Sequence, residues 1–199
     1  MAVRFGLLSG APALSIHNQR EATRRWIHFG FGLCILLLPW LQRWGGVAVA
    51  AAAVLYNALL APGLGLDRAY RRKAERRMGG LTSYPLAVLL LLLLTPLEVA
   101  AGAWAVLAAL DPAAAAVGSR WPRPGLPFNR RKSLTGTLAG WVAGTLSCAL
   151  VLTYMGVEGV WGPALCAAAA GALAESLPLP IDDNLPVAAA SALALLLCL

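Results

Sequence analysis

The chain has 199 residues, of which 59% are hydrophobic and 13% are charged, with a net charge of +7. A soluble domain carries about 25% charged residues, so this composition argues against an ordinary soluble domain and indicates a one-domain integral membrane protein. The apolar runs are rich in Ala, Leu and Val without two-residue alternation, which favours an all-α protein over a barrel of strands.

Seven apolar segments predict about seven transmembrane helices. They cover residues 27–42, 45–62, 84–95, 97–118, 134–154, 158–176 and 184–199. A membrane-spanning helix needs about 20 residues, so the run 84–118 is too long for one helix. Pro96 marks its natural break. A count of six, with 84–118 as one bent element, is the alternative.

The basic residues support seven spans with a cytoplasmic N-terminus and the C-terminus outside. In that arrangement the segment 1–26 and the loops 63–83, 119–133 and 177–183 are cytoplasmic and hold 15 of the 16 basic residues. Only Arg43 faces outward, as the positive-inside rule requires. Such loops also contact anionic lipid headgroups. They lack interleaved stacking aromatics, so no nucleic-acid partner is expected.

The domain organisation follows from this count. Residues 1–26 are predicted to be a cytoplasmic or interfacial segment, and residues 27–199 to be one transmembrane domain. In "EATRRWIH", Arg24, Arg25 and His28 share a helical face and could present cations to a phosphate. A histidine that simply lies at the membrane interface is the alternative.

Asp111 lies inside an apolar stretch, in "LAALDPAAAAVGSRW". A carboxylate in the middle of a membrane helix costs about 2.5–3.5 kcal/mol unless it is paired or bound to a metal. Asp111 precedes Gly118 by seven residues, which places it about 10 Å below the cytoplasmic end of its helix. It is predicted to be either a buried ion-pair partner or a metal or phosphate-site carboxylate.

A basic loop leads into the next helix through "NRRKSLTGTLAG". Ser133 can cap that helix, and the backbone N–H groups of a first helical turn favour anions. Lys132 and Arg131 add positive charge. The pattern is not a Walker A loop, because Arg131 stands where that motif requires Gly. The alternative is an orientation loop before a capped helix. Gly140 and Gly144 are spaced for close helix packing.

An acidic cluster stands in "AESLPLPIDDNLPV", residues 174–187, on the predicted cytoplasmic side. Glu175, Asp182 and Asp183 there could bind a divalent metal or accept a hydroxyl proton. An acidic patch beside the basic loop 119–133 is typical of metal-assisted phosphoryl transfer. A loop that is merely polar is the alternative.

These residues give the chain a family resemblance. It resembles the CTP-dependent lipid-alcohol kinases (dolichol kinase, phytol kinase and CTP-dependent diacylglycerol kinase), distant relatives of the phosphatidate cytidylyltransferases. Five motifs in chain order carry the likeness: "EATRRWIH" at 21–28, "GGLTSYPLA" at 79–87, Asp111 with Ala114 and Gly118, "KSLTGTLAG" at 132–140, and "AESLPLPIDDNLPV". Leu110 replaces a usual Gly, Thr135 a usual Glu, and Pro186 comes early. The cytidylyltransferase signature is not visible, which argues against CDP-lipid synthesis.

The resemblance implies transfer of the γ-phosphate of CTP, or of another nucleoside triphosphate, to a long-chain lipid alcohol at the cytoplasmic face. Phytol, geranylgeraniol, a polyprenol and diacylglycerol are all open as acceptors. Asp111, with Glu175 or Asp182, would hold Mg²⁺, and Asp183 would accept or orient the hydroxyl proton, although these roles are exchangeable. The catalytic set would be Asp183, Asp111 and Lys132. The nucleotide-binding set would be Lys132, Ser133, Gly136, Gly118, Arg131, Arg24, His28 and Asn184.

Two other functions stay open from the sequence. A small membrane transporter could use the intramembrane acidic residues as a substrate or proton path. The chain could also be an inactive member of the kinase family, since Thr135 replaces a Glu that could bind metal or cytidine. Nucleotide binding would separate the transporter from the kinase. A homo-oligomer is equally open.

Overall fold

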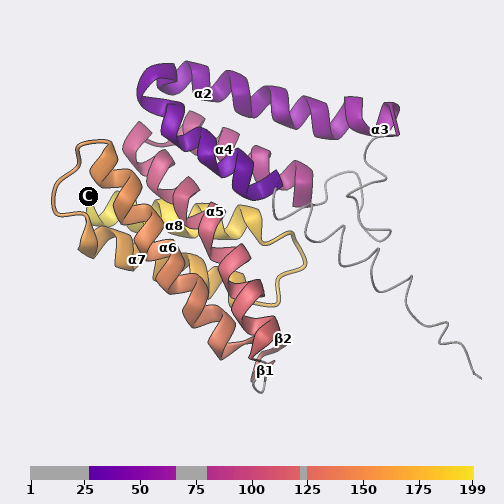
Figure 1. Cartoon of the computed structure of the whole chain (residues 1–199), viewed down its shortest axis with the longest axis vertical. Coiled ribbons are helices and arrows are strands. Elements are labelled where there is room, and N and C mark those ends of the chain that lie inside the picture. Colours follow the sequence, from indigo (N-terminus) through magenta and orange to yellow (C-terminus); the bar gives the residue numbers. More distant parts are fainter. Residues whose placement is uncertain (1–26, 66–79, 122–124) are drawn as a thin grey trace, which may run out of the picture.

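The computed structural model describes residues 27–65, 80–121 and 125–199, and these are almost entirely helical (Figure 1). The predicted segment 1–26, with Arg24, and most of the basic loop 63–83 lie outside the described residues. The elements are a first helix at residues 27–33, η1 (Cys34–Leu37), α2 (Leu38–Leu55), η2 (Tyr56–Leu60), α3 (Ala61–Gly63), α4 (Gly80–Leu94), α5 (Leu97–Arg120), β1 (Gly125–Leu126), β2 (Asn129–Ser133), α6 (Leu134–Tyr154), α7 (Trp161–Ser176) and α8 (Asn184–Cys198).

The first two predicted segments form a helical hairpin. The chain reverses at Gln42, whose φ of 55° and ψ of −175° interrupt the helical backbone inside α2. The Gln42 side chain donates a hydrogen bond of 2.6 Å to the carbonyl of Pro39 and so closes the turn. Figure 1 shows the two arms lying side by side and running in opposite directions. The predicted break between segments 27–42 and 45–62 is therefore confirmed.

Helix α5 is the centre of the fold, and it contacts α2, α4, α6, α7 and α8. Its residues from Val99 to Leu107 are all buried, and most of them are Ala, Gly or Val, which let neighbouring helices approach closely. The indole of Trp104 donates a hydrogen bond of 3.2 Å to the hydroxyl of Tyr84 in α4. This buried bond joins α4 to α5, the helix that also contains Asp111.

Two glycines of α6 are sites of close helix contact, as predicted from their spacing. A Cβ atom on Gly140 would lie 3.0 Å from the carbonyl oxygen of Leu110 in α5. A Cβ atom on Gly144 would lie 3.3 Å from both Val106 Cγ1 in α5 and Ala168 Cβ in α7. Glycine at these positions lets α6 pack against both neighbours.

The prediction of an all-α membrane protein holds, with two corrections. Helix α4 begins at Gly80 and not at residue 84, so Pro85 lies inside the helix. The predicted loop 119–133 contains a short antiparallel hairpin, in which Gly125 pairs with Ser133 and Leu126 with Asn129. Backbone pairing thus continues up to the residue that caps α6.

Large apolar side chains cover the outside of the helices. Leu94, Leu150 and Leu197 are 75%, 71% and 79% exposed, and an apolar surface of this extent indicates insertion into a membrane. Three helical stretches of the described residues are long and apolar enough to cross one, namely Ile27–Gly63 (which contains the reversal at Gln42), Leu97–Arg120 and Leu134–Tyr154; Thr82–Leu94 and Asn184–Cys198 are shorter apolar helices. The number and direction of the crossings stay predictions.

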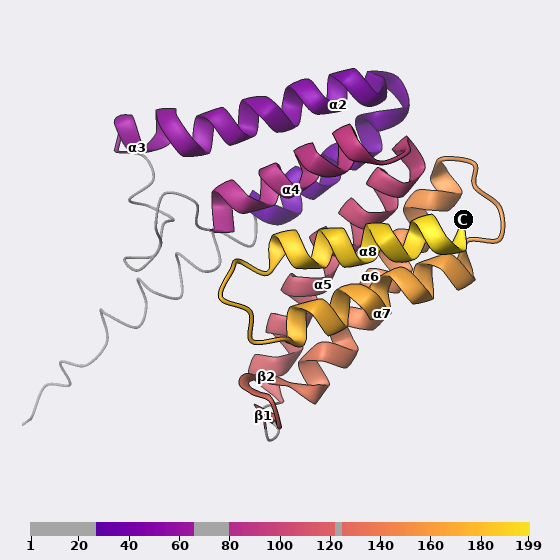
Figure 2. The ribbon, with the colours of Figure 1, turned by 180° about the vertical axis from the view of Figure 1, so that it is seen from behind.

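The helices alternate between two ends of the molecule. Figures 1 and 2 show the β-hairpin and the starts of α4 and α8 towards one end, while the turn at Gln42 and the C-terminus lie towards the other. We call the first of these the polar end, defined by the hairpin 125–133, the loop 177–183 and the start of α4. The sequence expected segments 119–133 and 177–183 to share one face, and they lie at the same end here.

Candidate active site

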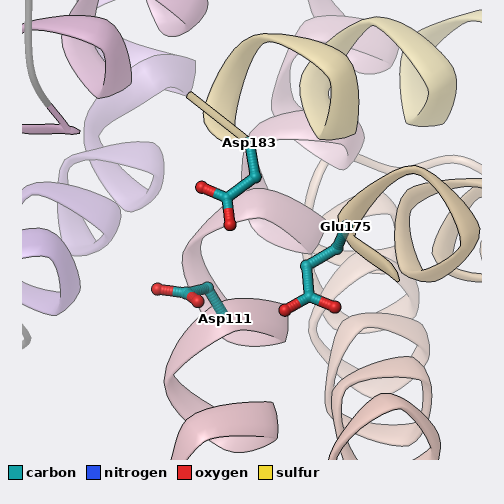
Figure 3. Close-up of side chains that lie close together, drawn as sticks. All are labelled: Asp111, Glu175 and Asp183. Atoms are coloured by element: carbon teal, nitrogen blue, oxygen red, sulfur yellow. The ribbon is translucent and has the colours of Figure 1, made fainter. Parts of the chain in front are cut away.

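Three carboxylates from three parts of the chain converge at the polar end. Asp111 lies in α5, Glu175 lies in the last turn of α7, and Asp183 immediately precedes α8. One carboxylate oxygen from each lies within 4.8 Å of those of the other two. Figure 3 shows the three side chains directed towards one another. The packing of α5 against α7 and α8 brings them together.

Lys132 supplies a positive charge to this cluster from strand β2. Its ammonium group donates a hydrogen bond to Glu175 Oε1, and its Nζ lies 3.2 Å from Asp183 Oδ2. Burial lowers the pKa of Lys132, but the negative charges of Glu175, Asp183 and Asp111 outweigh that effect and raise the pKa above its ordinary value. Lys132 is therefore a permanent cation at neutral pH.

The β-hairpin holds Lys132 in this position. The side chain of Asn129 donates a hydrogen bond of 3.0 Å to the carbonyl of Ser176, the residue after Glu175. The hydroxyl of Thr135 donates a hydrogen bond of 3.0 Å to the carbonyl of Trp121, which ties the start of α6 to the end of α5. Thr135 thus stabilises the start and end of the segment that contains the hairpin. It is not among the described residues that line the cleft.

Glu175 is the most deeply buried of the three acids. It is 3% exposed, and its Oε2 atom has no hydrogen-bond partner among the described residues. A buried acceptor without a partner costs about 1–3 kcal/mol. Carboxylate oxygens are the protein ligands that Mg²⁺ prefers. The free acceptor on Glu175, beside two further carboxylates, is therefore a donor set that fits a divalent cation.

A cleft of about 430 Å³ opens onto the cluster. Its lining comes from α5, the hairpin, the start of α6 and the end of α7: Asp111, Ala114, Ala115, Gly118, Ser119, Gly125, Arg130, Lys132, Ser133, Gly136, Thr137 and Glu175. Ligand pockets have volumes of about 300–1,000 Å³. The cleft has both acidic and basic residues on its walls, with Glu175 at the buried side and the exposed Arg130 at its rim.

The start of α6 lies against α5 at this cleft. The hydroxyl of Ser133 accepts a hydrogen bond of 3.2 Å from the backbone N–H of Gly136, so the predicted cap is confirmed. A Cβ atom on Gly136 would lie 2.8 Å from the carbonyl oxygen of Ala114, and one on Gly118 would lie 2.9 Å from Ser133 Oγ. Both glycines therefore allow the first turn of α6 to approach the backbone of α5.

Asp182 lies outside the cluster of three carboxylates, although the sequence proposed it as a metal ligand. Its Oδ1 atom accepts hydrogen bonds of 2.6 Å from Ser83 and from the Asn184 side chain, and one of 3.2 Å from the Asn184 backbone N–H. Bonding to the backbone two residues on is an Asx turn. Asp182 therefore shapes the loop that presents Asp183. The residue beside Asp111 and Glu175 is Asp183, and not Asp182 as the sequence had proposed for the metal site.

The remaining candidate residues for nucleotide binding are His28, Asn184, Arg24 and Arg131, and none of them is among the described residues that line the cleft. His28 is buried and stacks on Tyr84 with a centroid distance of 4.5 Å, and it is not among the described residues that line the cleft. Asn184 is buried at the start of α8, where its side chain also donates a hydrogen bond of 2.9 Å to Ser83. Arg24 and the side chain of Arg131 lie outside the described part of the chain.

Two residues of this region were not predicted. Ser83 connects α4 to Asp182 and Asn184, and Asn129 connects the hairpin to the end of α7. The signal for Ser83 was its place inside the "GGLTSYPLA" motif. Asn129 had no signal beyond its position three residues before Lys132, because its role depends on a contact with a distant helix.

Comparison of the chain with protein-family models, with curated proteins and with solved structures gives no match.

Proposed function

We propose that the protein is a membrane-embedded kinase that transfers the γ-phosphate of a nucleoside triphosphate, CTP by resemblance, to the hydroxyl of a long-chain lipid alcohol. The order of the five sequence motifs supports the choice of donor and acceptor. The site geometry supports the class of reaction, because phosphoryl transfer needs cations on the phosphates and a carboxylate near the attacking hydroxyl.

One observation carries the proposal. The ammonium of Lys132 lies between Glu175 and Asp183, beside Asp111, at the buried wall of a cleft that also contains the first turn of α6. A lysine, a helix start and a group of carboxylates are the parts that hold a triphosphate with its metal ion. Neither a transporter path nor a purely structural ion pair needs all three in one cleft.

The described residues divide naturally between two roles. Asp111 and the buried Glu175 would hold Mg²⁺, which when bound neutralises negative charge on the phosphates. Lys132 and the N–H groups near Ser133 and Gly136 would hold the phosphates, with Arg130 at the rim. These groups would fix the triphosphate with its γ-phosphorus facing the open side of the cluster.

Asp183 would act on the acceptor. Its side chain is 44% exposed, whereas Glu175 is 3% exposed, so an incoming hydroxyl reaches Asp183 more easily than Glu175. The Asp183 carboxylate would take the hydroxyl proton as the alcohol oxygen bonds to the γ-phosphorus. The bond between that phosphorus and the β–γ bridging oxygen breaks, and the nucleoside diphosphate leaves.

The membrane placement follows the alternating ends of the fold. We propose seven crossings, with the N-terminus and the polar end in the cytoplasm and the C-terminus outside. This arrangement agrees with the positive-inside distribution of the basic residues. It also gives the site access to cytoplasmic nucleotide and to an alcohol whose chain stays in the bilayer.

A transfer assay on the purified protein in detergent tests the proposal. It uses γ-labelled CTP and ATP with a panel of lipid alcohols, with and without Mg²⁺, and the Asp183→Asn variant as the control. Label in a lipid product with the wild type only supports the kinase and identifies its donor. No transfer to any alcohol overturns the proposal. Binding of CTP would then indicate an inactive relative, and no binding would favour a transporter.

A further inference from the structure

A second hollow in the molecule lies between α4 and α8. This groove has a volume of about 420 Å³. Helix α4 contributes Ala87, Leu91 and Leu94 to it, and helix α8 contributes Leu185, Ala189 and Leu193. Except for Thr95 at its far end, every residue that lines the groove is Ala or Leu, so its walls suit a hydrocarbon and offer almost nothing to a polar ligand.

Small and large side chains shape different parts of the groove. On α8, Ala188, Ala189 and Ala192 lie on one face at helical spacing and form a low floor. On α4, leucines at 90, 91 and 94 form a wall. Leu94 is 75% exposed and Leu193 is 59% exposed, so the groove is open to the membrane along its side.

The groove begins at the residues of the active site. Ser83 precedes Ala87 by one helical turn, and Asn184 immediately precedes Leu185; the Asn184 side chain donates a hydrogen bond of 2.9 Å to Ser83. This bond joins α4 and α8 next to the first lining residues of the groove. Asp183, the next residue back along the chain, lies 3.2 Å from Lys132. Asp183 therefore lies two residues before Leu185, where the apolar lining of α8 starts.

The groove then runs along both helices away from the polar end. Figure 2 shows α4 and α8 extending in the same direction from that end. The lining of α8 extends from Leu185 to Leu196, a length of about 17 Å at 1.5 Å per residue. An apolar groove of this length, which starts two residues after the Asp183 carboxylate, suits a chain with one polar end.

We propose that this groove holds the hydrocarbon chain of the lipid alcohol, with the hydroxyl at Asp183 and the chain extending between α4 and α8 towards Leu196. This inference rests on the proposed kinase function, whose acceptor it places. Chain length should then matter for affinity only up to the length of the groove.

Photolabelling tests the location without requiring activity. The probe is hexadecanol with a diazirine in its chain, added to the purified protein in detergent, and labelled peptides are mapped by mass spectrometry. We expect label on α4 and α8 that excess hexadecanol displaces and phosphatidylcholine does not. Label spread equally over the exposed faces of α2 and α6, or displaced equally by phosphatidylcholine, would overturn the inference and indicate ordinary boundary lipid.

Kinetics test the role of the groove with a matched pair of variants. Ala189 and Ala52 are both exposed alanines on apolar helices, but only Ala189 lines the groove. In Ala189→Phe, the KM for hexadecanol should rise about tenfold relative to that for hexanol, roughly the loss of burying two methylene groups. In Ala52→Phe the ratio should not change. An unchanged ratio in both variants would contradict the inference.

The two assays separate this inference from the proposed function. Transfer by the wild type with an unchanged chain-length ratio in Ala189→Phe would leave the kinase standing and remove the groove as the chain site. Displaceable label on α4 and α8 without transfer to any alcohol would leave a lipid-alcohol site on the groove and remove the kinase.

Discussion

Lys132 in the β-hairpin donates a hydrogen bond to Glu175, a carboxylate that is 3% exposed at the end of α7. This contact joins the most basic described loop to the most buried acid of the cluster. It has two consequences, because the same ammonium both stabilises a buried charge and lies where we propose that a triphosphate binds. Stability and activity can therefore be separated by changing one partner or both.

The Lys132→Met variant should lose about 2–3 kcal/mol of stability, because it leaves Glu175 buried without its cation. The double variant Lys132→Met with Glu175→Gln should recover most of that loss, since the buried charge is then removed and the Asp183 side chain is 44% exposed. Thermal unfolding in detergent measures both. A double variant no more stable than the single one would show that the ion pair does not stabilise the fold. Neither variant should transfer phosphate.

The pH dependence of this contribution follows from the raised pKa of Lys132. A raised folded pKa means that the stabilisation is complete below the unfolded value of about 10.4 and is lost as the pH rises through the folded value. The difference in stability between the wild type and Lys132→Met should therefore stay constant up to about pH 10 and decrease only at higher pH. A difference that falls between neutral pH and pH 9 would contradict the assignment of Lys132 as a permanent cation.

Adjacent acids should respond differently to the same substitution. Asp183→Asn should lower the transfer rate by at least about 100-fold, the range of a lost general base. Asp182→Asn should keep activity within a few-fold of the wild type, because an amide oxygen can still accept the bonds from Ser83 and Asn184. Equal losses in the two variants would show that the loop, and not the Asp183 carboxylate, limits the reaction. Circular dichroism checks that both variants fold.

Much of the fold was predictable from local sequence. Each predicted apolar segment coincides with a helical segment, because long runs of Ala, Leu and Val need no distant partner to define them. The start of α4 was placed too late, since residues 80–83 (Gly, Leu, Thr, Ser) do not continue the apolar run that defined the segment. The β-hairpin was missed because two very short strands in a loop rich in Pro and Gly leave no alternating pattern.

The sequence predicted most of the residues of the site, but it did not predict which of their side chains face one another. Asp111 was identified from its position in an apolar stretch, and Glu175 from its place in the acidic cluster with Asp182 and Asp183. The choice between Asp182 and Asp183 depends on how the loop turns before α8. Ser83, from a different helix, holds Asp182 and so decides which of the two neighbouring side chains points to Lys132. No local pattern contains that information.

Two Gly→Ala changes should have opposite effects on stability, because Gly136 lies at the contact between α5 and α6 and Gly162 lies in open space on α7. Gly136→Ala should lose about 1–3 kcal/mol, because its Cβ would lie 2.8 Å from the backbone oxygen of Ala114. Gly162→Ala in α7, where nothing lies within 4 Å, should gain up to about 1 kcal/mol from helix propensity. The melting temperatures in detergent give the comparison. A stable Gly136→Ala variant would mean that α6 can shift away from α5 without harm.

Divalent cations should bind to the carboxylate cluster in the absence of nucleotide. We expect Mn²⁺ to bind by electron paramagnetic resonance titration and Mg²⁺ to raise the melting temperature, since a ligand of the folded state stabilises it. Glu175→Gln should lose both effects. Glu158→Gln, in the exposed loop after α6, should keep both and is the control. Binding that survives in Glu175→Gln would place the cation elsewhere.

The side of the membrane that the site faces depends on α7, which has 16 residues and a length of about 24 Å. This is shorter than the hydrocarbon core of about 30 Å, so α7 must be helped across by its flanking residues or by local thinning of the bilayer. If α7 crosses, Leu179 and Glu158 lie on opposite sides. Both are exposed in the loops at its two ends.

Single-cysteine labelling in sealed vesicles decides the point, in a chain whose four native cysteines are replaced by alanine. Leu179→Cys should react with a membrane-impermeant maleimide only in inside-out vesicles, and Glu158→Cys only in right-side-out vesicles. Reaction of both from one side would show that α7 re-enters and does not cross. The polar end would then still hold the carboxylate cluster, but its access to cytoplasmic nucleotide would need a different topology, with the basic loops divided between the two faces.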